Sequence, residues 1–127
     1  MTTKLDMLAK LQEQKCLDNS DLLDDKKEKA SIWFASLRDE ICKSFVEIEN
    51  SQLNKNLKIN FVQNKWQRDG GGGGIISIMK GKIFEKVGVN ISTVYGHFSK
   101  EFRGQIPGAE ENGTFWASGI SVVSHMS

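Results

Sequence analysis

The residues best suited to chemistry lie near the end of the chain, in the segment 114–125 (TFWASGISVVSH). Its pattern predicts a strand, in which successive side chains turn to opposite faces. Ser121 and His125 would then share one face and lie about 13 Å apart, at roughly 3.3 Å per residue. An imidazole can transfer a proton or bind a metal ion. A lone strand histidine is more often a hydrogen-bonded structural residue, so the pattern alone leaves its role open.

Small residues accompany Ser121 on this predicted face. Ala117 and Gly119 would leave room above the strand for something bulky and flat. Ser124 belongs to the opposite face, because it lies an odd number of residues from Ser121. The segment therefore predicts one face suited to a large ligand.

A second candidate is the run of five glycines from Gly70 to Gly74, which follows Arg68. Glycine loses unusually large backbone freedom on ordering, so the run predicts a loop. Its bare N–H groups could cradle an anion, or the run could be a simple strand connection. It lacks the Gly-Lys-Ser/Thr ending of a phosphate-binding loop. The Arg68 guanidinium could pair with a carboxylate, although an exposed arginine at a strand end is the simpler interpretation.

Three blocks of sequence together identify a family. They are Trp66-Gln67-Arg68 with Gly71 to Gly74, the run from Ile83 to Ser92 with Gly96, and the run from Thr114 to His125. In order and spacing these blocks resemble the oxygen-dependent (aerobic) coproporphyrinogen III oxidases of haem biosynthesis. The resemblance covers about half of the chain, from roughly residue 60 to the end.

The resemblance implies an activity and two site residues. The reaction is the oxidative decarboxylation of two propionates of coproporphyrinogen III to vinyl groups, which gives protoporphyrinogen IX. Molecular oxygen is the co-substrate, and no flavin or haem is expected. The serine that matches Ser121 contacts substrate, and the histidine that matches His125 is a divalent-metal ligand in some bacterial members. Glu85 and Asn90 also fall in matched blocks, but their roles stay open.

The resemblance also implies a homodimer and a longer protein. Family members extend beyond the point that matches His125, and a further histidine and an Asn-x-Arg element follow there. We therefore interpret this sequence as an N-terminal fragment, with the catalytic residues expected beyond Ser127, and expect it to be inactive alone. The alternatives are a non-enzymatic anion-binding or interaction module that uses the glycine run, or an inert folding fragment.

The N-terminal part is predicted to be helical. Leucines at helical spacing predict a helix over residues 3–16, and the polar residues 17–21 predict a break. A second helix is expected from about residue 22 to 49. We expect its core stripe to contain Ala30, Trp33, Phe34, Leu37, Ile41, Phe45 and Ile48.

From residue 57 the period changes to that of strands. Strands are expected near residues 57–66, 75–79, 82–91, 93–98 and 114–125, with a tight turn at Lys80-Gly81 and a loop over 99–112. In the third strand, Ile83, Val87 and Val89 are predicted on one face and Phe84 on the other. The fold class is α+β, with helices over 1–50 and a mostly antiparallel sheet over 57–127. Residues 1–127 would form the N-terminal part of one domain with a larger, helix-flanked sheet.

Composition sets the remaining limits. The 127 residues carry a formal net charge of +1, so no nucleic-acid partner is expected. Cys16 and Cys42 lack CxxC spacing and are interpreted as reduced thiols. No apolar run approaches the roughly 20 residues of a membrane span, and no signal-peptide core is present. We therefore expect a cytoplasmic protein without a membrane span.

Overall fold

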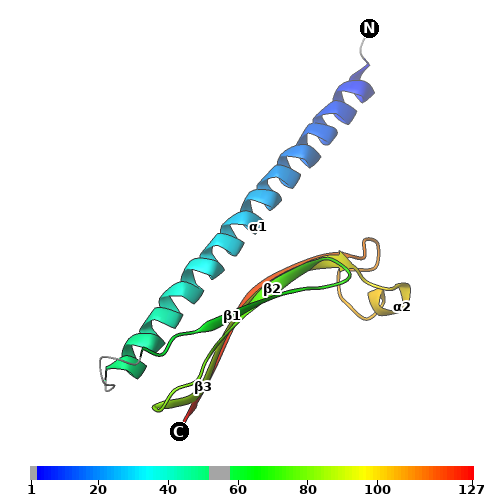
Figure 1. The fold of residues 1–127 in the computed structure, drawn as a ribbon. Helices are drawn as coiled ribbons and strands as arrows, with labels where there is room; N and C mark the ends of the chain where they lie inside the picture. Colours follow the sequence, from blue (N-terminus) through cyan, green and yellow to red (C-terminus); the bar gives the residue numbers. More distant parts are fainter. Residues whose placement is uncertain (1–2, 52–57) are drawn as a thin grey trace.

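The computed structural model describes residues 3–51 and 58–127, although not the side chains of residues 13–20. The helices and strands in these ranges are α1 (Lys4–Asn50), β1 (Val62–Gln67), β2 (Gly72–Met79), β3 (Phe84–His97), α2 (Lys100–Arg103) and β4 (Thr114–Met126). The predicted α+β class is confirmed, with a helical N-terminal part followed by a sheet (Figure 1). Neither helix is long and apolar enough to cross a membrane in the part of the chain described.

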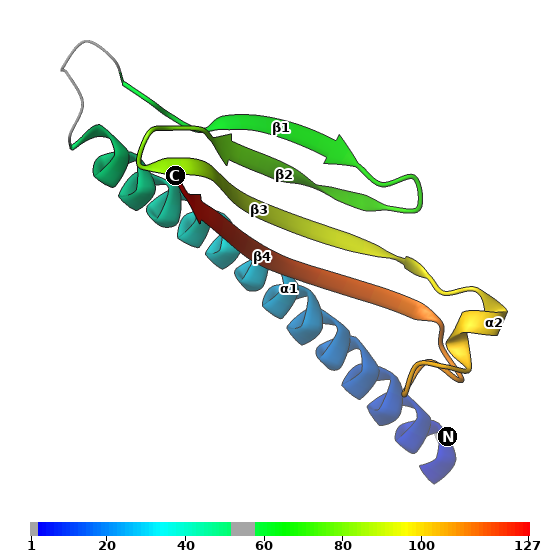
Figure 2. The same cartoon turned by 90° about the horizontal axis from the view of Figure 1, so that it is seen from below.

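The sheet is a meander in which every strand is antiparallel to its neighbour. The spatial order β1-β2-β3-β4 follows the sequence (Figure 2). The predicted hairpin around Gly81 joins β2 to β3. The two strands predicted over 82–91 and 93–98 are one strand, β3, because no residue near position 92 interrupts its pairing with β4. The predicted loop over 99–112 contains the short helix α2.

The helix α1 covers one face of this sheet and leaves the other face uncovered (Figure 1). The buried core lies between α1 and the sheet at the C-terminal half of the helix. It consists of Met79, Phe84, Val87 and Val89, with Ile41, Cys42, Phe45 and Val46 of the helix packed against them. Phe45 meets Phe84 edge to face, with ring centroids 5.0 Å apart. The described part of the chain is therefore two layers deep, helix on sheet.

The predicted break at residues 17–21 is wrong, because α1 runs unbroken through them. These positions hold Leu, Asp, Asn and Ser, but no glycine or proline. Asp, Asn and Ser each cost only a few tenths of a kcal/mol more than alanine inside a helix, so they weaken a helix without ending it. A capping box at Thr3 and Asp6 fixes the N-terminal end.

The predicted core stripe of α1 is partly wrong. Phe34, Ile41 and Phe45 are at least half-buried as predicted, but the exposed fraction is 59% for Trp33 and 49% for Ile48. The side of α1 that faces the sheet contains three polar residues, Ser31, Arg38 and Glu49, and a search for apolar periodicity does not find them. The apolar residues of α1 span more than one face, so periodicity alone did not locate the buried side.

Phe84 was assigned to the wrong face of its strand. It is buried with Val87 and Val89, because the pairing of β3 with β4 shifts between Phe84 and Lys86. This β-bulge inserts Glu85 as an extra residue, which resets the alternation of side chains. A bulge leaves no clear mark in a single sequence.

Cys42 is a half-buried free thiol beside the core. Burial raises its pKa, so the thiol stays protonated at neutral pH. The side chain of Cys16 lies outside the described residues.

A single carboxylate joins the end of α1 to the turn between β2 and β3. Glu49 is fully buried, and its carboxylate accepts hydrogen bonds from the backbone N–H groups of Lys82, Ile83 and Phe84. Burial opposes its ionisation, but the bonds from these three N–H groups outweigh it and lower the pKa of Glu49 below the usual 4.5. A side chain at Gly81 would collide with this carboxylate, which explains the glycine there.

Replacing Glu49 by alanine should therefore destabilise the fold by about 2–4 kcal/mol, because three backbone donors lose their acceptor. Glu47→Ala is the control. Glu47 is exposed and forms only a loose surface ion pair with Lys43, at 4.0 Å, so its replacement should change the unfolding free energy by less than about 0.5 kcal/mol. Urea unfolding followed by circular dichroism measures both. Equal midpoints for the two variants would contradict the role of Glu49.

The same carboxylate predicts a pH dependence. A lowered folded-state pKa means that ionised Glu49 stabilises the fold above about pH 4.5, and that this stability is lost as the pH falls through the folded-state pKa. The difference in unfolding free energy between the wild type and Glu49→Gln should be constant from about pH 7 to 5 and shrink at lower pH. A difference that is unchanged down to the acid transition would exclude this linkage.

Candidate functional site

Ser121 and His125 lie on the sheet face turned away from α1, which we call the open face. In the register of the sheet, Ser121 is opposite Asn90 and His125 is opposite Lys86. Directly opposed residues of antiparallel strands share a face. The core residue Val89 next to Asn90 points towards α1, so Asn90 and Ser121 point away from it. The predicted alternation of 114–125 is therefore confirmed, and Ser121 is exposed.

Two shallow hollows follow each other along the open face. One, of about 420 Å³, is bordered by Trp66, Gly119 and Ser121. The other, of about 260 Å³, is bordered by Lys86, Gly88 and His125. Ile76 and Asn90 border both hollows and lie between them. The two predicted site residues thus line adjacent parts of one surface, but not the same hollow.

Cationic groups lie at both ends of this surface. Lys86 is the cross-strand neighbour of His125 at one end. Beyond the other end, Arg68 borders neither hollow. It donates a hydrogen bond from Nη1 to the carbonyl oxygen of Tyr95 at 3.0 Å, and its guanidinium lies 5.3 Å from the centre of the Phe115 ring. Arg68 is therefore held in place but still exposed. Such an arrangement favours an anionic ligand.

A metal site at His125 is not supported by the residues described. No group of three or more His, Cys, Asp or Glu side chains that could hold a metal ion occurs in that part of the chain. The nearest cross-strand neighbour of His125 is Lys86, whose charge disfavours a bound cation. His125 could supply one ligand at most.

The glycine run is part of the sheet, and its assignment as a loop is wrong for three of its five residues. Gly72, Gly73 and Gly74 begin β2 and pair with β3, and Gly73 and Gly74 also pair with β1. Gly71 and Gly72 adopt positive φ angles of 130° and 83°, which favour glycine. Because these backbone groups take part in the sheet, the run is not a bare anion cradle.

Close approach explains the next two glycines. A side chain at Gly73 would collide with the carbonyl oxygen of Trp66, and one at Gly74 would collide with that of Ile91. At Gly74 the added carbon would also come within 2.9 Å of the Trp66 ring. The run therefore lets neighbouring strands and the Trp66 ring pack tightly.

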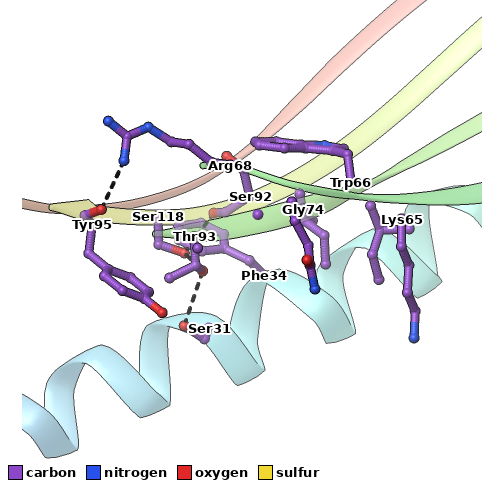
Figure 3. Close-up of a pocket in the computed structure, with 15 residues that line it drawn as sticks. Ser31, Phe34, Lys65, Trp66, Arg68, Gly74, Ser92, Thr93, Tyr95 and Ser118 are labelled. Atoms are coloured by element: carbon purple, nitrogen blue, oxygen red, sulfur yellow. Dashed lines mark hydrogen bonds between the residues drawn. The ribbon is translucent and has the colours of Figure 1, made fainter. Parts of the chain in front are cut away.

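A further groove, of about 590 Å³, lies between α1 and the glycine end of the sheet (Figure 3). Ser31, Thr93 and Ser118 line it. The hydroxyl oxygen of Thr93 lies 3.5 Å from that of Ser31 and 2.9 Å from that of Ser118. The Trp66 ring lies on the far side of the sheet from α1 (Figure 3). Neither Ser121 nor His125 borders this groove, so it is separate from the predicted site.

Sequence reasoning missed Lys86 and Ile76 as neighbours of the predicted site. The signal that could have found Lys86 is the register of the last two strands, which the bulge at Glu85 obscures. Glu85 itself is exposed and borders neither hollow of the open face. Asn90, to which the sequence assigns no role, borders both hollows.

The fold is that of an α+β protein in which a helix covers one face of a four-stranded antiparallel sheet, and the candidate site residues lie on the other face. A sequence profile of the family described as Coproporphyrinogen III oxidase matches residues 29–127. The chain belongs to the coproporphyrinogen III oxidase family. This match includes all four strands and most of the sheet-covering part of α1.

Individual relatives agree with the family match. The oxygen-dependent coproporphyrinogen-III oxidase of Rickettsia felis (strain ATCC VR-1525 / URRWXCal2) is 60% identical over 104 residues, which cover 80% of this chain and 37% of the relative. Those of Rickettsia akari (strain Hartford) and Rickettsia bellii (strain RML369-C) are 59% and 58% identical over 104 and 102 residues, with coverage of 80% and 79% of this chain and 37% of each relative. The chain thus spans little more than a third of the length of these relatives.

Two glycines of the sheet give a matched pair of variants. Gly74→Ala should destabilise the fold by about 1–3 kcal/mol, because the new methyl group collides with backbone and with the Trp66 ring. Gly119→Ala should change stability by less than about 1 kcal/mol, since nothing lies within 4 Å of the added carbon. Thermal unfolding compares them. Equal losses in both variants would show that close packing does not explain the glycine run.

Proposed function

We propose that this chain supplies part of the substrate-binding surface of an oxygen-dependent coproporphyrinogen III oxidase. The reaction would convert two propionates of coproporphyrinogen III to vinyl groups and give protoporphyrinogen IX, with molecular oxygen as the oxidant. The observation that carries this proposal is the position of Ser121 and Gly119 on the open face, within the part of the chain that matches the family.

The chemistry of the substrate suits this surface. Coproporphyrinogen III is a flexible macrocycle with four carboxylates, so its site needs a broad, glycine-lined surface and cationic groups at the rim. Gly88 and Gly119 provide the low relief, and Lys86 and Arg68 provide positive charge at the two ends. Ser121 lies between them and would donate a hydrogen bond to a polar group of the substrate.

Each decarboxylation releases CO₂ and removes two electrons and one proton from the remaining side chain, and the dioxygen that takes up two electrons and two protons leaves as hydrogen peroxide. Dioxygen accepts these electrons, so the protein has to position the substrate, assist proton transfer at the pyrrole and exclude bulk water. We place the acid catalyst and further carboxylate-binding groups in the part of the family polypeptide that this chain does not cover. An uncovered sheet face is consistent with such a division.

Several finer features belong to this proposal. We propose that residues 1–127 are the N-terminal part of a single oxidase domain, that the enzyme is a homodimer, and that it works in the cytoplasm without flavin or haem. A divalent metal is proposed only in the limited sense that His125 could supply one ligand. No step of the reaction is assigned to that metal.

The test uses a chimera in which this chain replaces the matching region of the Rickettsia felis relative. Ser121→Ala should lower kcat/KM for coproporphyrinogen III by about two- to tenfold, as expected for one lost neutral hydrogen bond. Ser121→Phe should remove measurable turnover, because its ring would fill the space above Gly119. Thermal midpoints measured in parallel exclude unfolding as the cause.

Ser124→Ala is the matched control, because Ser124 is equally exposed on β4 but belongs to the opposite face. Its kcat/KM should equal that of the unmodified chimera. Unchanged turnover in a folded Ser121→Phe variant would remove the open face from consideration as the substrate surface.

A further inference from the structure

Asn90 occupies the centre of the open face. It lies in the middle of β3, directly opposite Ser121 on β4 and Ile76 on β2. Opposed residues have Cβ atoms about 4.5–5.5 Å apart, so the side chains of Asn90 and Ser121 can contact the same small group. Asn90 also borders both hollows, whereas Ser121 borders only one.

The Asn90 side chain has an unused hydrogen-bond acceptor. Its Oδ1 atom is shielded from solvent and accepts no hydrogen bond from the residues that the structure describes. Among the described side chains, two other atoms are shielded and unpaired, Arg38 Nη1 and Ser77 Oγ. They belong to fully or nearly fully buried residues outside the two hollows. A shielded acceptor without a donor destabilises a protein, so such a group usually has a functional or structural partner.

The amide can turn towards a ligand without losing an interaction. No hydrogen bond holds Oδ1 in its present orientation. The terminal torsion of asparagine is broad, so a partial rotation about it can bring the oxygen from its shielded position towards the hollows. The neighbouring Gly88 and Gly119 have no side chains that could obstruct a ligand above the amide.

We propose that the side-chain oxygen of Asn90 accepts a hydrogen bond from a pyrrole N–H of the porphyrinogen, beside the contact made by Ser121; this rests on the proposed function. An unused acceptor requires a donor. The ionised propionates of this substrate only accept hydrogen bonds, whereas the N–H groups at the centre of its ring donate them. Asn90 thus centres the macrocycle between the two hollows, with its carboxylates directed towards the cationic ends of the open face.

The experiment measures KM and kcat for coproporphyrinogen III in the chimera with the Rickettsia felis relative. Asn90→Leu keeps the size of the side chain but removes the acceptor, and should raise KM about 5- to 30-fold. Asn90→Asp keeps an acceptor and should stay within about threefold of the unmodified chimera. Asn64→Leu is the control, because Asn64 lies on the same face of the outer strand but borders neither hollow; it should change neither constant.

The Asp and Leu variants together distinguish a role of the Asn90 oxygen as hydrogen-bond acceptor from a role of its N–H group as donor. A contact of the Asn90 amide N–H with a propionate would make Asn90→Asp worse than Asn90→Leu, because two carboxylates repel, and that order would overturn the proposal. Unchanged KM and kcat in Asn90→Leu would overturn it as well. A chimera that is inactive without any substitution would instead overturn the proposed function on which it rests.

Discussion

The buried carboxylate of Glu49 fixes how the helix meets the sheet. It accepts hydrogen bonds from the backbone N–H groups of three consecutive residues after the β2–β3 turn, at the point where α1 ends. The hydrophobic core lies next to this junction, and the N-terminal end of α1 extends past the sheet (Figure 2). Because α1 lies on one face of the sheet, the other face stays uncovered in the described part of the chain (Figure 1). The geometry of the candidate site thus depends on a contact that lies on the opposite side of the sheet.

The two faces of the sheet differ in how far their side chains are buried. The face under α1 carries Met79, Val87 and Val89, whose burial drives the packing of the two layers. The open face mixes glycines and polar residues with large apolar residues that stay partly exposed, among them Trp66, Ile76 and Val123. A polar residue there is therefore free of the demands of the core, and an unpaired acceptor such as that of Asn90 calls for a partner outside the described residues.

The sequence predicted the parts of this structure that depend on local alternation. The face shared by Ser121 and His125 follows from period two alone, and the α+β order follows from the change of period near residue 57. Properties that depend on tertiary contacts were not accessible. Gly73 and Gly74 look like a loop until the neighbouring carbonyl groups are known, and Phe84 changes face because of a bulge that only pairing reveals. The exposure of Trp33 has the same origin, since polar residues occupy the line of α1 that faces the sheet.

The sequence predicted only half of the candidate site, for a related reason. Ser121 and His125 lie on one strand four residues apart, so their common face follows from the alternation of side chains. Asn90 and Lys86 reach the same surface through the register between β3 and β4, which places them opposite Ser121 and His125, each more than thirty positions away in the chain. Such long-range pairs define a broad ligand surface, because a flat macrocycle spans several strands rather than one. A sheet face that binds such a ligand is therefore encoded across strands, and its central residue can be recognised only once the strands are placed side by side.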